Sequence, residues 1–117
     1  MGLNLIPGVI KRFPEILENR KIKVPHIAWN TIYKSTITWD STALKDLVND
    51  DFMYFIHSYY VHPEDKSCVL TLTDYDSIEF CSSILYNNIF ATQFHPEKSA
   101  DKGISIYRNW AKIHNLI

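Results

Sequence analysis

Hydrophobic and polar positions alternate along much of the chain, which is the pattern of half-buried β-strands. The segments that show it or are rich in β-branched and aromatic residues are predicted to be strands: 9–13, 52–61, 68–73 and 89–94. Segment 78–85 is similarly apolar. We expect strand 68–73 to pair with strand 52–61, because only a short charged turn separates them.

Two stretches interrupt this pattern. Residues 14–23 are polar, and we predict a loop there. The apolar segment 24–32 contains Pro25, which has no amide proton to donate to a neighbouring strand. We therefore expect an edge strand or irregular structure over 24–32.

Helical spacing of apolar residues occurs in two places. Residues 41–48 are predicted to form a short helix, which Ser41 or Thr42 caps. Its apolar face consists of Leu44, Leu47 and Val48. Residues 102–114 are predicted to form a closing helix with Trp110 on its buried stripe; the positions at helical spacing are Ile104, Tyr107, Trp110, Ala111 and His114.

Composition narrows the class of protein. The 117 residues suffice for one domain, and 46% hydrophobic with 21% charged residues is typical of a globular chain. The net charge is −1, so there is no basic excess for binding nucleic acid. The chain has only three glycines, which excludes the glycine-rich loops that bind phosphates and dinucleotides.

The cysteines and the apolar runs exclude further classes. Cys68 and Cys81 are too few for a disulfide scaffold and form no C-x-x-C pair for zinc. No apolar run is long enough to cross a membrane, and the N-terminal sequence does not have the pattern of a signal peptide. We therefore expect a soluble, cytoplasmic chain without a membrane partner.

The residues most suggestive of chemistry are His95, Pro96 and Glu97. In an extended chain, side chains two residues apart point to the same side, so the imidazole and the carboxylate can meet. A carboxylate beside a histidine fixes its tautomer and stabilises the imidazolium, which prepares a base for a nucleophile. The same pair can instead be a surface salt bridge, and the tripeptide alone does not distinguish the two.

The chain contains a second copy of the tripeptide, His62, Pro63 and Glu64. It lies between two predicted strands and is followed by a charged sequence, so we interpret it as a solvated turn. Only the copy at 95–97 follows an apolar strand and precedes a predicted helix.

Four blocks of the sequence resemble class I glutamine amidotransferases and, within them, the glutaminase subunits of imidazole glycerol phosphate synthases. They are residues 2–9 with 12–13 (GLNLIPGV and RF), 23–30 (KVPHIAWN), 54–60 (YFIHSYY) and 93–99 (QFHPEKS). Proteins of this kind release ammonia from glutamine and pass it to a partner synthase in histidine biosynthesis.

The resemblance implies roles for particular residues. His95 is expected to act as the catalytic acid and base, and Glu97 to orient it. The backbone around Ser58 and Tyr59 is expected to hold the substrate glutamine. The residues expected to face the synthase or cyclase partner are Trp29, Tyr54 and Lys98. No metal and no cofactor are implied.

The chain also departs from the family pattern. The family's nucleophilic cysteine lies in a G-x-C-x-G turn upstream of the matching region, and this sequence contains no such motif. We expect Cys68 and Cys81 to be core residues instead, because neither has flanking glycines. Ala28 replaces the glycine that precedes the tryptophan in the family. The chain therefore resembles the C-terminal part of a glutaminase.

The remaining histidines have plainer interpretations. We interpret His57 as a hydrogen-bonded structural residue, and His26 and His114 have no partner visible in the sequence. His57, His62 and Glu64 match no compact metal-ligand spacing.

Three hypotheses remain open for the function. The chain is a glutaminase subunit or a fragment of one; it is a catalytically silent module that binds the partner; or it belongs to a paralogous system that amidates another metabolite.

The resemblance implies a three-layer α/β domain around a largely parallel sheet, of which residues 1–117 form the strand-rich C-terminal part and the closing helix. An uncovered sheet edge favours self-association or a complementing chain.

Overall fold

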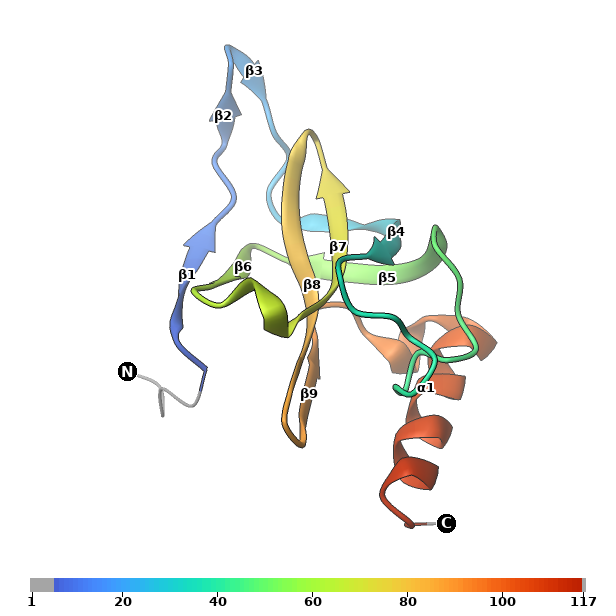
Figure 1. Cartoon of the computed structure of the whole chain (residues 1–117). Coiled ribbons are helices and arrows are strands. Elements are labelled where there is room, and N and C mark those ends of the chain that lie inside the picture. The colour runs from blue at the N-terminus through green and yellow to red at the C-terminus, as the bar shows by residue number, and fades with distance from the viewer. Residues whose placement is uncertain (1–5, 117) are drawn as a thin grey trace.

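The computed structural model describes residues 6–116 and shows a strand-rich fold with one long helix at its end (Figure 1). The elements are β1 (Gly8–Arg12), β2 (Ile16–Leu17), β3 (Arg20–Lys21), β4 (His26–Lys34), β5 (Asp51–His57), β6 (Tyr59–Pro63), the 3₁₀ turn η1 (Lys66–Cys68), β7 (Val69–Tyr75), β8 (Ile78–Tyr86), β9 (Ile89–Thr92), the 3₁₀ turn η2 (Pro96–Lys98) and α1 (Ala100–Ile113). The predicted strand-rich part with a closing helix is confirmed. Residues 2–5 of the first matching block lie outside the described residues.

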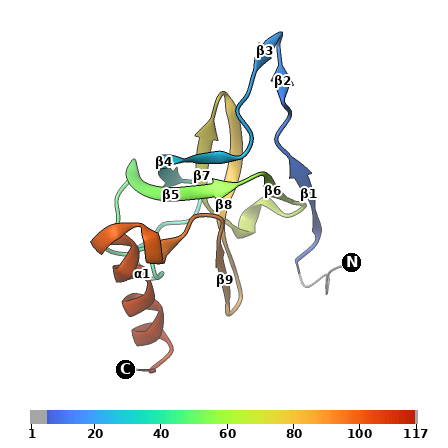
Figure 2. The ribbon, with the colours of Figure 1, turned by 180° about the vertical axis from the view of Figure 1, so that it is seen from behind.

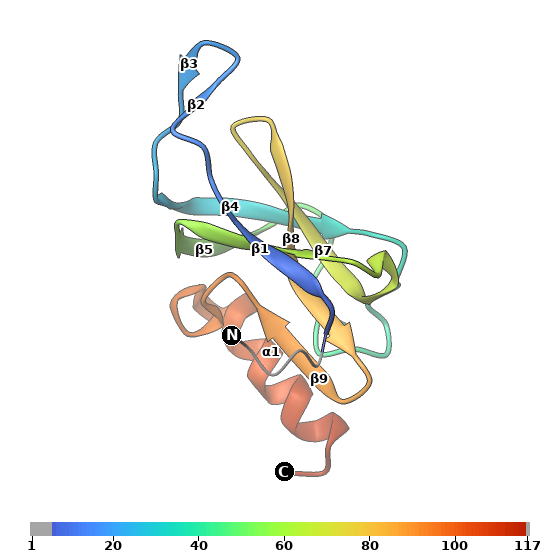
Figure 3. The same cartoon turned by 90° about the vertical axis from the view of Figure 1, so that its left-hand side faces the viewer.

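The strands form one seven-stranded sheet in the order β1-β6-β8-β7-β4-β5, with β9 paired to β8. Its pairings within the described residues are antiparallel, so this part does not display the largely parallel sheet that the resemblance implies. β4 and β5 run across β7 and β8, as expected for a strongly twisted sheet (Figures 1 and 2). β2 and β3 form a separate hairpin that projects away from the rest (Figure 3).

The prediction of an edge strand or irregular structure at 24–32 is right as an edge strand, because residues 26–32 pair only with β5, and wrong as irregular structure. Pro25 lies one residue before β4 and therefore removes no hydrogen bond from it. β4 pairs with β5 along most of its length and with β7 through Tyr33 and Lys34. The predicted loop at 14–23 was also partly wrong, because it contains the short β2–β3 hairpin.

The predicted strand 52–61 is divided at Ser58 into β5 and β6, which lie in different parts of the sheet. The predicted pairing of strand 68–73 with this segment is wrong, since β7 pairs with β4 and β8. The break at Ser58 directs β6 to β1 and β8, and η1 then separates β6 from β7.

The predicted helix at 41–48 is a series of turns. The Thr42 hydroxyl donates to the Trp39 carbonyl oxygen over 2.8 Å and accepts from the Leu44 amide over 3.1 Å. Such local bonds compete with helical hydrogen bonds. The turns still bury Leu44 and Leu47, whereas Val48 is exposed.

The core lies between the sheet, these turns and α1. Its buried members are Phe13, Ile32, Trp39, Ala43, Leu44, Leu47, Met53, Phe55, Leu70, Phe80, Phe94 and Ile106. The predicted buried stripe of the helix is partly right, because Trp110 packs half-buried against the core. Ile104, Tyr107 and His114 are exposed, and the buried positions of α1 are Gly103, Ile106 and Asn109. The pattern missed Asn109 because this residue is polar: it donates to the Ala43 carbonyl oxygen and to Asp46.

The first turn of α1 lies against η2 because residue 103 is glycine. A Cβ atom at Gly103 would lie 2.1 Å from the carbonyl oxygen of Pro96 and 2.7 Å from Cβ of Ser99. No side chain fits in that space. The start of the helix therefore packs directly on the segment that carries His95 and Glu97.

Candidate functional site

His95 and Glu97 are in contact, with 2.9 Å between Nδ1 of the imidazole and Oε2 of the carboxylate. The predicted contact is present, but the backbone differs from the expected extended chain. Only His95 is extended, while Pro96–Lys98 form η2, which brings Glu97 back toward the imidazole. The side chains of His95 and Glu97 are 37% and 49% exposed, so the pair is accessible to another molecule.

Hydrogen bonds to the backbone of Tyr54, in β5, hold the segment that carries this pair. The His95 amide donates to the Tyr54 carbonyl oxygen over 3.0 Å. The Ser99 hydroxyl accepts from the Tyr54 amide over 2.9 Å and donates to the His95 carbonyl oxygen over 2.6 Å. Ser99 stands at the N-cap of α1, yet its side chain makes no capping bond. It connects β5 to the His95 segment instead.

The electrostatics of the pair suit acid–base chemistry. When Nδ1 of a neutral imidazole donates to Glu97, Nε2 carries the lone pair and can take a proton. The Glu97 backbone amide, followed by the hydrogen bond and charge of His95, lowers the pKa of Glu97, with Tyr107 contributing. The Tyr107 hydroxyl donates to the second oxygen of Glu97, Oε1, over 3.3 Å.

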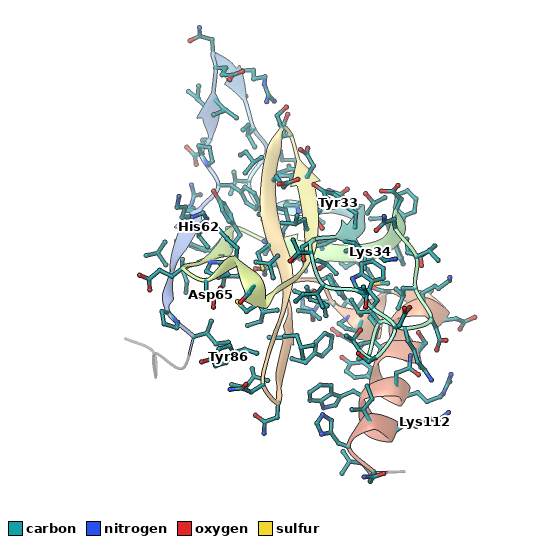
Figure 4. The ribbon with its side chains drawn as sticks, viewed as in Figure 1. Tyr33, Lys34, His62, Asp65, Tyr86 and Lys112 are labelled. Carbon is teal, nitrogen blue, oxygen red and sulfur yellow. The ribbon has the colours of Figure 1, made fainter. Side chains whose placement is uncertain are left out.

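The other tripeptide copy has a different setting. His62 is exposed, as predicted, but it belongs to the end of β6 rather than to a turn. A ring nitrogen of His62 lies 3.3 Å from Nζ of Lys66, and the charges of Lys66 and Lys11 lower the pKa of His62. Figure 4 shows His62 on the side of the molecule away from α1.

Both cysteines are buried, which confirms their prediction as core residues. The Cys68 thiol donates to the Asp65 carbonyl oxygen, and the Cys81 thiol to the Ser83 carbonyl oxygen. Burial raises the pKa of Cys68 and raises the pKa of Cys81 to about 12. Neither thiol is set up to form the thiolate that a nucleophile requires.

Ser58 and Tyr59, the predicted substrate-binding residues, form the corner between β5 and β6. The Ser58 carbonyl oxygen accepts from the Phe13 amide over 3.0 Å, and the Tyr59 side chain is exposed. The corner directly follows β5, in which the Tyr54 carbonyl oxygen accepts a hydrogen bond from the His95 amide.

The predicted partner-facing residues lie near one another. Trp29 and Tyr54 are opposite residues on β4 and β5, with ring centroids 5.9 Å apart, and Trp29 is 50% exposed. Lys98 is exposed on η2, which packs on β5. Strand β5 therefore brings these residues and His95 into one region.

The sequence-based reasoning missed a buried contact between His26 and His57. Nδ1 of His26 lies 2.9 Å from Nε2 of His57, so His57 is a hydrogen-bonded structural residue as predicted, but with a partner that was not foreseen. The antiparallel pairing of β4 with β5 places these residues opposite each other. The contact could not be predicted without knowing that β4 pairs with β5 in this register. Residues 6–116 contain no group of three metal-ligating side chains.

Within the described part of the chain, no helix is long and apolar enough to cross a membrane.

Comparisons with known proteins find a matching family and relatives over nearly the whole chain. The family model described as glutamine amidotransferase class-I matches residues 7–112. The imidazole glycerol phosphate synthase subunit HisH of Geobacter metallireducens is 42% identical over 94% of the chain, and that of Aquifex aeolicus is 43% identical over 95%. The Pyrococcus furiosus subunit is 36% identical over 96%. The chain covers 51%, 49% and 53% of these relatives, so it spans about half their length.

Proposed function

The chain belongs to the class I glutamine amidotransferase family, and from this premise we propose that it supplies the acid–base part of a glutaminase centre. In this proposal the centre releases ammonia from glutamine for a partner synthase of the imidazole glycerol phosphate synthase type. The observation that carries the proposal is the accessible 2.9 Å contact between His95 and Glu97.

The proposed chemistry assigns the proton transfers to His95. Nε2 of His95 takes the proton of a cysteine thiol, and the thiolate attacks the amide carbon of glutamine. A C–S bond forms, and the C–N bond breaks as the same proton passes to the leaving ammonia. Water then hydrolyses the thioester with His95 as the base. Glu97 holds the imidazole in one tautomer and stabilises the imidazolium.

In this proposal the thiol comes from outside residues 1–117. Cys68 and Cys81 are buried with raised pKa values, and the chain spans about half the length of its relatives. A hollow of about 580 Å³ is lined by residues of β6, β7 and β8, where Val61, Val69 and Leu72 lie beside polar residues such as His62 and Glu79. We assign this hollow to the part of the glutaminase that carries the thiol, since exposed apolar surface is a contact site for other protein segments.

The proposed synthase-binding surface is the outward face of β4 and β5. Side chains alternate across a strand, and the paired residues on this face are Ile27 with Ile56, Trp29 with Tyr54, and Thr31 with Phe52. The large apolar ones among them are exposed: Ile27, Trp29, Phe52 and Ile56. An aromatic and aliphatic strip with a cation at Lys98 beside it suits a protein interface.

The test is reconstitution. The chain is mixed with the half of the Geobacter metallireducens subunit that it does not match, and glutamine hydrolysis is measured. We expect no hydrolysis by the chain alone and measurable hydrolysis by the mixture. His95→Ala should reduce kcat at least about 100-fold, while the matched control His114→Ala, on an exposed histidine of the last turn, should not.

Three results would overturn the proposal. The first is turnover by the chain alone that is lost on substitution of Cys68 or Cys81. The second is turnover by the mixture that survives His95→Ala, and the third is a wild-type mixture that shows no turnover. Self-association of the chain in place of binding to the added half would overturn the assignment of the hollow.

The synthase-binding surface has its own test. We expect Trp29→Ala to weaken binding of the chain to a cyclase subunit at least tenfold, measured by calorimetry. The matched control is Ile16→Ala, which removes another exposed apolar side chain, on the distant β2–β3 hairpin. Equal effects of the two substitutions on binding would contradict the assignment of the outward face of β4 and β5 as the synthase-binding surface.

A catalytically silent binding module is the second candidate, and the two buried, unreactive cysteines favour it. The two candidates differ in the reconstitution. A silent module binds the cyclase subunit through the strip but produces no ammonia with the added half.

A further inference from the structure

A line of hydrogen bonds through two buried histidines leads to the Ser58–Tyr59 corner. Nδ2 of Asn30 lies 3.2 Å from Nε2 of His26, whose Nδ1 lies 2.9 Å from Nε2 of His57. Nδ1 of His57 lies 2.9 Å from the carbonyl oxygen of Tyr59. His26 is completely buried and His57 is 9% exposed.

The partners determine the direction of every bond. A carbonyl oxygen only accepts, so Nδ1 of His57 carries its proton and donates to Tyr59. Nδ2 of Asn30 donates to the Asp74 carbonyl oxygen and its Oδ1 accepts from the Thr31 amide, so Asn30 presents a donor to Nε2 of His26. Nε2 of His26 therefore accepts, the proton of this ring lies on Nδ1, and Nδ1 donates to Nε2 of His57. Both rings are therefore neutral imidazoles with the proton on Nδ1.

The packing holds both rings in place. His26 is stacked between Phe55, at a centroid distance of 5.0 Å, and Tyr75, at 3.9 Å. Phe13 contacts the edge of His57 at 5.2 Å. Burial lowers the pKa of both histidines, in agreement with the neutral rings that the geometry requires.

The line also ties strands together. The Asn30 amide donates to the carbonyl oxygen of Asp74 in β7 over 2.9 Å. The hydrogen bonds therefore run from β7 through β4 and β5 to the start of β6. The last bond is to the carbonyl oxygen of Tyr59. The neighbouring carbonyl oxygen, of Ser58, accepts a hydrogen bond from the Phe13 amide.

We propose that His57, held in one tautomer by His26, is a positioning residue that fixes the peptide at the Ser58–Tyr59 corner for binding glutamine. This rests on the proposed function, in which the corner holds the substrate. With both carbonyls bonded inside the protein, the orientation of the corner is set before the substrate arrives, so binding does not have to order it.

The first experiment needs no activity. Long-range ¹H–¹⁵N NMR of the 117-residue chain should show the proton on Nδ1 of both His26 and His57 at pH 7. A proton on Nε2 of either ring would overturn the proposal. In His57→Phe the carbonyl ¹³C resonance of Tyr59 should shift, because the ring keeps its packing and loses the donor. An unchanged resonance would also overturn it.

The second experiment measures glutamine turnover in the mixture with the complementing half. We expect His57→Phe to raise KM for glutamine about tenfold with a smaller effect on kcat. His57→Asn retains a donor near the Nδ1 position and should restore most of the affinity. The matched control Ile32→Val perturbs the same core in β4 without removing a hydrogen bond, and it should leave KM unchanged.

The two experiments separate the hypotheses. If the wild-type mixture shows no turnover but the NMR results are as expected, the glutaminase proposal fails and the pair is a positioning element of a non-catalytic corner. If turnover is present and His57→Phe alters kcat and KM no more than Ile32→Val, the positioning role is wrong while the glutaminase proposal stands.

Discussion

The amide of His95 donates to the carbonyl oxygen of Tyr54 over 3.0 Å, so one strand holds the acid–base pair and carries the aromatic strip. The Tyr54 side chain faces Trp29 on the outward surface, while its backbone bonds to His95 and Ser99. The position of His95 therefore depends on β5 rather than on a flexible loop.

Replacing Glu97 by glutamine should reduce kcat of the reconstituted mixture by about 100-fold or more. The amide keeps the shape of the side chain but cannot stabilise an imidazolium. Steady-state kinetics gives the value. Glu64→Gln, the same change in the other tripeptide, is the control and should leave kcat unchanged. Equal losses of kcat in the two variants would show that the contact of Glu97 with His95 does not support catalysis.

Replacing Tyr107 by phenylalanine should raise the pKa of Glu97, because the substitution removes the donor to Oε1. The carboxyl ¹³C resonance of Glu97 follows this pKa in an NMR titration. The bond is long and exposed, so the effect on folding stability should be small. A titration identical to that of the wild type would refute the hydrogen bond.

Replacing Gly103 by alanine should destabilise the fold by about 1–3 kcal/mol, measured by urea unfolding. In an open helix the same change stabilises by about 1 kcal/mol, so the sign of the effect is informative. The new methyl group would collide with the Pro96 carbonyl oxygen. Arg108→Ala, at an exposed position of α1, is the control; a stabilising Gly103→Ala would contradict the close packing.

Folding stability should decrease as the pH falls from about 6.5 to about 4. Burial, followed by the charge of His57, lowers the pKa of His26 to about 4, so the unfolded chain takes up a proton before the folded chain does. The slope from one such group is at most ~1.4 kcal/mol per pH unit, and the contribution is complete above the unfolded pKa.

His26→Phe provides the control for this pH dependence, since it keeps the stacking on Phe55 and Tyr75 and removes the titrating ring. His57 is the titratable group bonded to His26, and Tyr75 is the titratable side chain stacked on it. The difference between wild type and variant in urea midpoint should shrink toward pH 4. A constant difference would exclude His26 as the source.

The two thiols should react with a disulfide reagent at least about 100-fold more slowly in the folded chain than in urea at pH 7.5. Both are buried, and burial raises the pKa of each. The absorbance of the released thiol follows the reaction. Rapid labelling of Cys81 in the folded chain would contradict the raised pKa and would reopen the question of a nucleophile within these residues.

The sequence predicted the elements whose signal is local. The alternation at 9–13 and the tripeptide at His95 depend on neighbouring residues, and both the strand and the His95–Glu97 contact are present. The helix at 41–48 failed because the Thr42 hydroxyl makes turn hydrogen bonds that hydrophobic spacing does not reveal. The buried stripe on α1 was predicted correctly at Trp110 but not at Asn109, which is buried because its amide donates to the Ala43 carbonyl oxygen and to Asp46.

The contacts that hold the site were not predictable in the same way. His26 and His57 are 31 residues apart, and they meet only because β4 and β5 pair in one register. The bond from His95 to Tyr54 likewise depends on where η2 returns to the sheet. Such contacts are set by the topology of the sheet, which a single sequence does not specify.

The alternation of side chains along β5 limits how this chain can vary. Met53, Phe55 and His57 point inward, and Phe52, Tyr54 and Ile56 point outward. Losing or gaining one amino acid inside the strand would exchange these two sets, exposing the core residues and turning the outward strip into the interior. Homologues should therefore differ from this chain in β5 by replacement of amino acids, and length differences should fall in the turns on either side.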